Sequence, residues 1–490
     1  NNFTMSCYVA VFDSFAAASS LKYTVQVIKE VARDSSKLSS IITAGLEEGS
    51  NSVDGLKQST SLGSYLLNEV DCSDAPTDCA DLNRQECFRT KNTCGPCISD
   101  EYIGDEGDSN EACILLVQET TARNDSLVSG ECLTVSDCDA FQQCRSGQCV
   151  SQPMSCAANC SYPQGTCMYV DKNSGEVVST CYVGSTSCSA VCDCTEEFIG
   201  SDTCSLNTTE IAQKQALRSK VIQSIQQLVA LEYADEQTVV DWIGSVVSAS
   251  QASDELSDEG ITTLLSTVNA ILTNAVNTGV NTESLMKLLK SVDASVTANA
   301  KAKARRRRLQ SRVGDGKSSG AWRLLSQSGG GLSTLTQAED ILAQFRSYAS
   351  DKLLPGQDAV SVLLPEFRII VQKLSLLSLS ASASSSSAAG GITTQAPQTA
   401  LENRNGQVAN SLSIPVDGST DTSESAITVA LTSLRSELFN KELSLTGEQQ
   451  IFSNPLRVQL SGIGCSGMSC RFEMVLQTSS KMKSYASVQS

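Results

Sequence analysis

The chain has 490 residues, 36 of them basic and 54 acidic, which gives a formal net charge of −18. It contains 21 cysteines and no histidine, which excludes Ser-His-Asp and Cys-His nucleophiles, histidine-ligated zinc or haem, and imidazole pH switches. The acidic balance argues against non-specific nucleic-acid binding, which depends on Lys and Arg to neutralise phosphates. We therefore expect no catalytic residues, no cofactor and no nucleic-acid partner.

The first 30 residues alternate with period two in the runs Cys7–Phe12 and Tyr23–Ile28, which predicts a β-hairpin. Two strands cannot bury a core alone, so we expect 1–30 to be the last hairpin of a β-sandwich that is completed elsewhere. The chain begins at Asn1 with no initiator Met or signal peptide, from which we expect a mature or excised product. Helical spacing then predicts a helical connector over 31–71.

Eighteen cysteines lie in the next 133 residues, from Cys72 to Cys204. Only Cys94-x-x-Cys97 has CxxC spacing, so a zinc ribbon is not expected and a disulfide framework from an oxidising compartment is favoured. We expect cysteine-rich modules over 72–150 and an EGF-like module over 151–205, whereas spacing leaves the pairing open. The cysteines expected in disulfides are Cys72, Cys79, Cys87, Cys94, Cys97, Cys113, Cys132, Cys138, Cys144, Cys149, Cys156, Cys160, Cys167, Cys181, Cys188, Cys192, Cys194 and Cys204, with Cys465 and Cys470 near the end of the chain.

Four Asn-x-Ser/Thr sequons agree with an extracellular location, because three of them lie in or beside the cysteine-rich block. They are Asn2, Asn124, Asn159 and Asn207, and we expect N-linked glycans on them. The longest uncharged run, Leu374–Leu401, is too polar to span a membrane, so any membrane anchor is expected outside this segment.

Apolar residues at helical spacing predict an antiparallel bundle over 206–300. A basic and Gly/Ser-rich loop is expected over 301–332. The segment 333–365 is expected to hold a final helix that begins with a Thr334-x-x-Gln337 capping box and reaches about Leu354. Five short alternating runs then predict a β-sandwich over 366–490. The runs are Phe367–Leu374, Leu412–Val416, Ile427–Leu431, Pro455–Leu460 and Phe472–Leu476. The expected fold class is a multidomain α+β chain.

The order of these parts resembles the extracellular region of polycystin-1-like proteins, in which a receptor-for-egg-jelly (REJ) region is followed by a GAIN domain. The residues that carry the resemblance are the Ig-like end from Cys7 to Ile28, the motif Cys87–Cys97 with Gly165-Thr-Cys167, and the strands Phe367–Leu374 and Ser453–Leu460. Cysteine-rich or EGF-like insertions occur in such proteins of algae and related protists. The resemblance implies a GAIN-like sandwich that stops before the His-containing autoproteolysis motif, so no self-cleavage is expected here.

Two charged segments are candidate sites. Asp100, Asp105 and Asp108 lie in a Gly-rich acidic loop that could bind calcium, but the EF-hand order is absent and a solvated acidic loop is the favoured interpretation. The run Arg305, Arg306, Arg307 and Arg308 could be cleaved by subtilisin-like convertases, could complete a helix dipole, or could bind anionic glycans. Flanking Gly and Ser favour an exposed loop. Ser311, Ser318, Ser319 and the serine tract 375–387 are candidate O-glycan acceptors.

Two functional hypotheses follow. The first is a non-enzymatic scaffold, adhesion or receptor segment of a polycystin-1-like surface glycoprotein at a cell or flagellar surface. The alternative is a structural subunit of an extracellular filament, such as a mastigoneme or glycocalyx fibril. The expected partners are other extracellular proteins or copies of the same chain. A secreted hydrolase is poorly supported, because no carboxylate pair lies on a recognisable frame.

Overall fold

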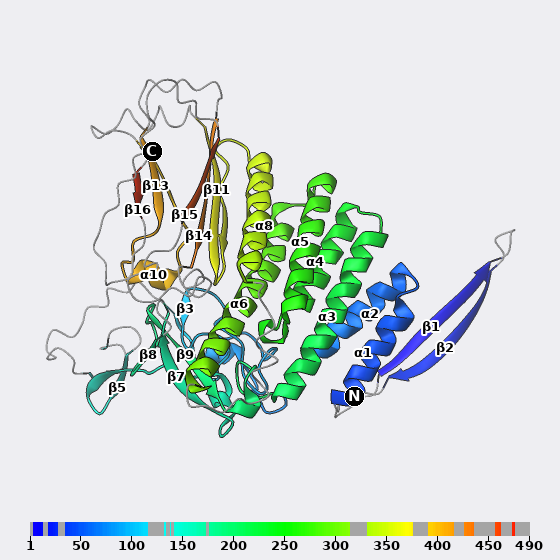
Figure 1. The fold of residues 1–490 in the computed structure, drawn as a ribbon, viewed down its shortest axis with the longest axis horizontal. Coiled ribbons are helices and arrows are strands. Elements are labelled where there is room, and N and C mark those ends of the chain that lie inside the picture. The colour runs from blue at the N-terminus through cyan, green and yellow to red at the C-terminus, as the bar shows by residue number, and fades with distance from the viewer. Residues whose placement is uncertain are drawn as a thin grey trace.

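The protein is an α+β chain of helices, antiparallel sheets and many disulfides, with a separate hairpin at its start (Figure 1). The computed structural model describes residues 3–12, 18–27, 35–115, 132–133, 138, 142–172, 176–313, 331–375, 391–415, 426–435, 456–461 and 473–475. The sequons at Asn2 and Asn124, the pair Cys465 and Cys470, and the candidate O-glycan acceptors Ser318, Ser319 and 376–387 lie outside these ranges.

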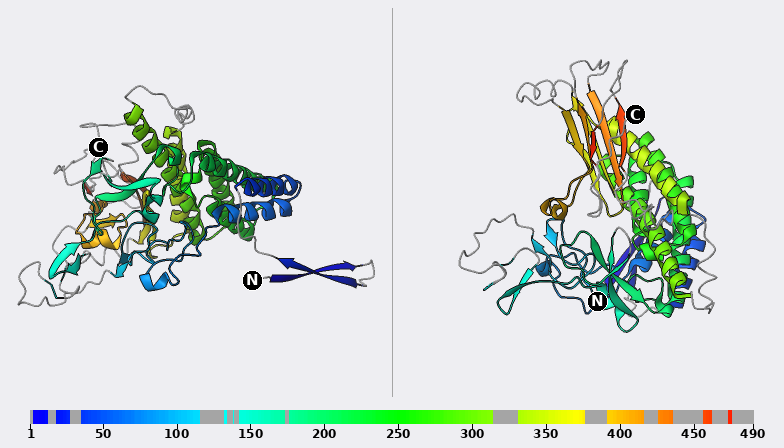
Figure 2. Two further views of the ribbon diagram at one scale, coloured as in Figure 1. Left: turned by 90° about the horizontal axis from the view of Figure 1, so that it is seen from below. Right: turned by 60° about the vertical axis from the view of Figure 1, so that its left-hand side comes forward.

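The hairpin consists of β1 (Phe3–Phe12) and β2 (Ala18–Val27), which are longer than the two expected runs. They pair antiparallel, with Cys7 opposite Tyr23. Successive residues of a strand alternate between its faces. The register places Phe3, Met5, Val9, Val11, Leu21, Val25 and Val27 on one, apolar face, whereas the other, more polar face carries Thr4, Ser6, Ser20, Lys22, Thr24 and Gln26 together with Ala10 and Phe12. Figures 1 and 2 show that the hairpin stands away from the rest of the molecule.

The expected connector is a helical hairpin, α1 (Ser35–Gly49) and α2 (Val53–Asn68), that packs against the bundle. The Ser52 hydroxyl caps α2 by accepting a hydrogen bond from the Gly55 N–H. A Cβ on Gly63 would lie 2.9 Å from Val221 Cγ2, so this glycine permits a close approach of α2 to the bundle. The two helices belong to the same hydrophobic core as the bundle and do not form a separate spacer.

Disulfides hold the next block, in which the strands are short. Each of the nine disulfides among the described residues lies within one of three groups, 72–113, 132–149 or 156–204. The pairs are Cys72–Cys87, Cys79–Cys94, Cys97–Cys113, Cys132–Cys144, Cys138–Cys149, Cys156–Cys167, Cys160–Cys192, Cys181–Cys188 and Cys194–Cys204. The strands are β3 (Tyr102–Ile103), β4 (Ile114–Leu115), β5 (Gln142–Arg145), β6 (Gln148–Ser151), β7 (Gly165–Asp171), β8 (Val177–Val178) and β9 (Cys188–Cys194). Such a framework favours folding in an oxidising compartment.

The bundle follows the predicted apolar stripes. It contains α3 (Thr208–Leu231), α4 (Glu236–Ala249), the short helix η5 (Ser253–Glu255), α5 (Asp258–Thr278), α6 (Thr282–Val313) and α8 (Gly331–Lys352). Asn207 caps α3 in a capping box with Glu210, and α5 ends at Gly279, whose φ of 79° is left-handed.

The structure differs from the expected loop over 301–332, because α6 continues as helix through the arginine run to Val313. Residues 301–313 contain neither Gly nor Pro and are rich in Ala, Lys and Arg, which are strong helix formers. The final helix, α8, begins at Gly331, so Thr334 lies inside it rather than at its start, and its end is close to the expected Leu354. It ends at Lys352, and β10 (Val360–Leu363) begins the sheet before Pro365.

Two antiparallel sheets pack on each other at the C-terminal end. The first has the strand order β10-β11-β14-β15 and the second β12-β13-β16. Their remaining bounds are β11 (Phe367–Ser375), β12 (Gly391–Gln395), β13 (Ser411–Pro415), β14 (Ala426–Leu434), β15 (Leu456–Ser461) and β16 (Glu473–Val475), with the short helix α10 (Ala400–Arg404) between β12 and β13. On β11, Phe367 and Ile369 face the bundle core, whereas Ile370 packs in a second core with Leu412 of the other sheet. The bundle and first sheet therefore share one core.

The disulfide block also contacts the C-terminal sheets. Leu401 of α10 packs against the cluster that contains Ile103 and Cys181, and Asn405 Nδ2 donates to the Gly184 carbonyl at 3.3 Å. The block, the bundle and the sheets thus contact one another in pairs (Figure 2). The block does not separate the bundle from the C-terminal sheets, which share one core. In the described part of the chain, no helix is long and apolar enough to cross a bilayer.

Candidate functional site

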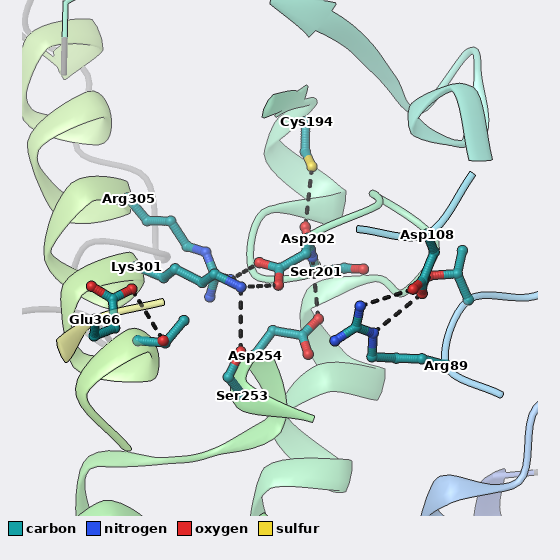
Figure 3. Close-up of polar contacts among 12 residues, drawn as sticks. Arg89, Asp108, Cys194, Ser201, Asp202, Ser253, Asp254, Lys301, Arg305 and Glu366 are labelled. Atoms are coloured by element: carbon teal, nitrogen blue, oxygen red, sulfur yellow. Dashed lines mark hydrogen bonds and ion pairs between the residues drawn. The ribbon is translucent and has the colours of Figure 1, made fainter. Parts of the chain in front are cut away.

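The candidate site is a polar stripe along α6, formed by Asp293, Thr297, Lys301 and Arg305. These residues are spaced four apart, so they follow one side of the helix. Elsewhere on the same helix, Leu288 and its apolar neighbours are buried in the bundle core. The stripe is therefore the polar side of an amphipathic helix, and it faces the sheets at one end and the disulfide block at the other (Figure 3).

At its first end the stripe meets Glu366, which precedes β11. The Glu366 N–H donates to Asp293 Oδ1 at 2.9 Å, and Thr297 Oγ1 donates to Glu366 Oε1 at 3.2 Å. The Asp293 and Glu366 side chains are buried, and Arg435 Nη1 lies 3.6 Å from Glu366 Oε1. Burial, together with the nearby Glu366 carboxylate, raises the pKa of Asp293 to about 7. This junction of bundle and sheet therefore takes up a proton near neutral pH.

At its second end the stripe binds Asp202, which lies in the loop closed by the Cys194–Cys204 disulfide. Lys301 Nζ lies 2.5 Å from Asp202 Oδ2, and Arg305 Nη2 lies 2.9 Å from Asp202 Oδ1. Desolvation opposes ionisation, but these two cations hold the pKa of Asp202 below its usual value. Figure 3 shows both side chains of α6 converging on this carboxylate.

The helix η5 supplies a second carboxylate at this end. The Asp202 N–H donates to Asp254 Oδ2 at 3.2 Å, and Lys301 Nζ donates to Ser253 Oγ at 3.3 Å. Burial, together with the nearby carboxylates of Asp202 and Glu255, raises the pKa of Asp254 to about 6. The junction between the disulfide block and the bundle is thus also sensitive to mild acid.

Arg89 extends the cluster into the first cysteine module. Its Nη2 lies 2.8 Å from Asp108 Oδ1 and its Nε donates to Asp108 Oδ2 at 3.2 Å. Desolvation lowers the pKa of Arg89, but its hydrogen bonds to Asp108 and the more distant Asp202 and Asp254 outweigh it and raise the pKa. Three carboxylates and three cations therefore meet where the cysteine modules, η5 and α6 join. Because they pair with one another, these groups join the cysteine modules to the bundle.

A second charge network lies inside the bundle, around the buried Arg218 of α3. Arg218 Nη1 donates to Asn68 Oδ1 at 3.0 Å and to the Ala249 carbonyl at 2.9 Å. Its Nε donates to Glu255 Oε2 at 3.1 Å, and Lys214 Nζ donates to Glu255 Oε1 at 2.7 Å. Although desolvation opposes it, the two cations lower the pKa of Glu255. Arg218 thus ties together the ends of α2 and α4 and the helix η5.

Two of the three candidate calcium residues, Asp105 and Asp108, accept hydrogen bonds from protein donors. Asp100 is exposed, but Asp105 and Asp108 are buried and not solvated. Asp105 accepts hydrogen bonds from Ser109 Oγ and from the Ser155 N–H, which joins the first cysteine module to the EGF-like segment. Among the described residues, the groups of metal-ligating type that lie close together are cysteines already joined in disulfides.

The other predicted site residues fall in different places. Asn159 is exposed in a left-handed turn, and the Asn207 carboxamide oxygen accepts the N–H groups of Thr209 and Glu210 as a helix cap. Arg305 is bound to Asp202, while Arg306–Arg308 are described only as helical backbone.

Sequence reasoning missed Asp202, Asp254, Asp293, Lys301 and Glu366. The signal that could have found the α6 members is the four-residue spacing of polar residues along a helix whose other side is apolar. The comparison with protein families found no family model that matches this chain. No curated protein matches it either.

Proposed function

We propose that this chain is a non-enzymatic scaffold, adhesion or receptor segment of an extracellular glycoprotein with polycystin-1-like architecture, carried at a cell or ciliary surface. The observation that carries the proposal is how the α6 stripe is used. Lys301 and Arg305 bind Asp202 on one side, and Asp293 and Thr297 bind Glu366 on the other, so that a disulfide-rich block is fixed to a bundle and a sandwich. Fixed geometry between modules is what a protein needs to present a binding surface.

Local features support the finer assignments. In the segment Cys156–Cys204, Cys156 pairs with Cys167 across Cys160, and Cys194–Cys204 closes the end, which suits an EGF-like module. A helical bundle that shares its core with a two-sheet sandwich suits a GAIN-like region. A hairpin with one apolar face suits the end of an REJ-like sandwich.

The test uses the full chain expressed with a secretion leader in eukaryotic cells. We expect labelling by a membrane-impermeant biotin reagent, loss of mass on N-glycan removal, and the nine disulfides in a non-reducing peptide map. A chain that escapes the reagent and carries neither glycans nor disulfides would refute the proposal. A cytosolic form of the chain, expressed without the leader, is the control.

The alternative, a filament subunit, is favoured by one observation, the exposed apolar face of β1–β2. Leu21 and Tyr23 on this face are 69% and 66% exposed, and Val11 is 66% exposed. Ten-residue strands make a face about 33 Å long. Lys22 is the only charged residue in the two strands and lies on the polar face, so nothing on the apolar face opposes association.

Two matched variants distinguish these functions. Leu21→Lys places a charge on the apolar face, and Thr24→Lys places the same charge on the polar face, where Thr24 is also exposed. If the hairpin drives assembly, sedimentation should show the wild type and Thr24→Lys associated and Leu21→Lys monomeric. A monomeric wild type at all concentrations would leave the scaffold function and refute the filament.

A further inference from the structure

The arginine run is the one place in the sequence where basic residues are adjacent. An endoprotease that recognises paired basic residues therefore has one target, Arg305–Arg308, in the whole chain. The structure places this target inside α6, near the helix end at Val313. Folded helices are cleaved through their transiently opened state, so the stability of this helix end sets how fast such a cut occurs.

Polar contacts hold this end of the helix. Among the described side chains of α6, Ala298 is the last that is buried in the bundle core and Ala300 the last that packs against it. Beyond that point Lys301 and Arg305 bind Asp202, and Lys301 also contacts Ser253. The Asp202 side chain is 38% exposed and the Arg305 side chain 20% exposed, so the contact lies at the surface, where water and salt can compete for it.

We propose that the arginine run is a latent processing site for an endoprotease specific for paired basic residues. The site becomes accessible to the protease only when the C-terminal end of α6 separates from Asp202. In the cut, water adds across the peptide bond between Arg308 and Leu309. The carbonyl carbon gains the hydroxyl and becomes the new carboxylate, and the Leu309 nitrogen takes the proton and becomes the new amine. Arg305, the first residue of the target, is itself one of the groups that bind Asp202.

The two products should remain together after the cut. Residues after the cut supply α8, whose Ile341, Leu342 and Phe345 are buried in the core shared with α5 and α6. The disulfides of the described residues all lie between Cys72 and Cys204, so none of them crosses the cut. Processing would therefore convert one chain into two chains that are held by core packing and by hydrogen bonds such as that from the Glu366 N–H to Asp293, with no disulfide of the described residues between them.

The experiment compares cleavage of the full-length protein with that of two variants and a control. Asp202→Asn removes the carboxylate from the block, and Lys301→Gln weakens the same contact from the helix without changing the arginine run. Glu196→Gln is the control, because Glu196 is an exposed carboxylate of the same module. Cleavage by a paired-basic endoprotease is followed on reducing gels, and mass spectrometry locates the new termini.

We expect Asp202→Asn to be cut roughly five- to tenfold faster than the wild type, the factor for two partly exposed ion pairs that share one carboxylate. Lys301→Gln should be cut faster by a smaller factor, and Glu196→Gln at the wild-type rate. Circular dichroism checks that each variant is folded. Equal rates for the wild type and Asp202→Asn, or a wild type cut as fast as a free peptide of residues 301–313, would overturn the proposal. On a native sizing column the cut protein should elute with the intact one, and separation of the fragments would refute the shared-core step.

Discussion

Replacing Arg218 with alanine should destabilise the bundle far more than any change of a surface charge. Arg218 is fully buried, and its guanidinium donates to Glu255, Asn68 and the Ala249 carbonyl. These acceptors come from three different elements. Removing the side chain leaves the Ala249 carbonyl and Asn68 Oδ1 without this donor and leaves the buried Glu255 carboxylate with Lys214 alone.

The expected loss follows from which partners remain. Glu255 would keep only Lys214 as a cation, and its side chain is 7% exposed, so its charge would be largely uncompensated. Breaking a buried ion pair by removing one partner costs about 3–5 kcal/mol in unfolding free energy. Lys214→Ala is the matched control, because Lys214 binds the same carboxylate but is 27% exposed. Its loss should cost no more than about 1 kcal/mol.

The measurement is unfolding in urea followed by circular dichroism at the helix band, with disulfides intact in every sample. The midpoint for Arg218→Ala should fall well below that for Lys214→Ala, with an unchanged slope. If the two variants lose the same amount of stability, the buried network is not what holds α2, α4 and η5 together, and our reasoning fails. The double variant Arg218→Met/Glu255→Gln keeps the side-chain volume and removes both charges, and its unfolding midpoint should lie between those of Arg218→Ala and Lys214→Ala.

Three further predictions concern other parts of the molecule. The pKa of the Asp293 carboxyl is about 7 in the folded protein and 3.8 as its ordinary value, so the folded state binds this proton more tightly. The contribution of Asp293 to folding stability is therefore largest below pH 4 and is lost as the pH rises to 7. This loss of folding stability is at most about 4 kcal/mol. The variant Asp293→Asn should flatten the pH profile of thermal unfolding between pH 5 and 8. An unchanged profile would contradict the raised pKa of Asp293. Reduction should unfold residues 72–204 before the bundle, since each disulfide is worth roughly 2–4 kcal/mol there; hydrogen exchange in reductant that leaves both equally protected would count against it. Glycopeptide mass spectrometry should find glycans at Asn124 and Asn207, and bare asparagine at both would remove the support that the sequons give to a secretory origin.

The sequence predicted the parts of the fold that have regular apolar spacing. The segment 206–300, in which apolar residues recur at helical spacing, forms α3, α4, α5 and most of α6, and the runs after Pro365 form strands of two antiparallel sheets. The prediction was wrong where the composition of neighbouring residues suggested the wrong element. The Gly and Ser around the arginine run suggested a loop, but Lys301–Val313 by itself is rich in helix formers and α6 continues through it.

The candidate site could not be predicted, because its groups come from distant parts of the chain. Asp202 and Lys301 meet only after the disulfide block has folded back onto α6, and Glu366 reaches Asp293 only through the packing of the sheet. The cysteine content did predict a disulfide framework. The pairing itself had to come from the structure, since spacing does not fix connectivity.

The disulfide block is an insertion between two helices that pack together, and this has a consequence for synthesis. Asn68 at the end of α2 contacts Arg218, which is ten residues, or about 15 Å, from the start of α3 at Thr208. At roughly 5–20 residues per second, a ribosome needs about 7 to 28 seconds to make residues 69–207, and during that time α1 and α2 have no partner to cover their apolar side. Oxidation of the block while it emerges would shorten the flexible chain between α2 and α3 and so lower the entropy cost of bringing them together. An oxidising compartment would thus assist the assembly of the helical core, although none of the described disulfides lies within it.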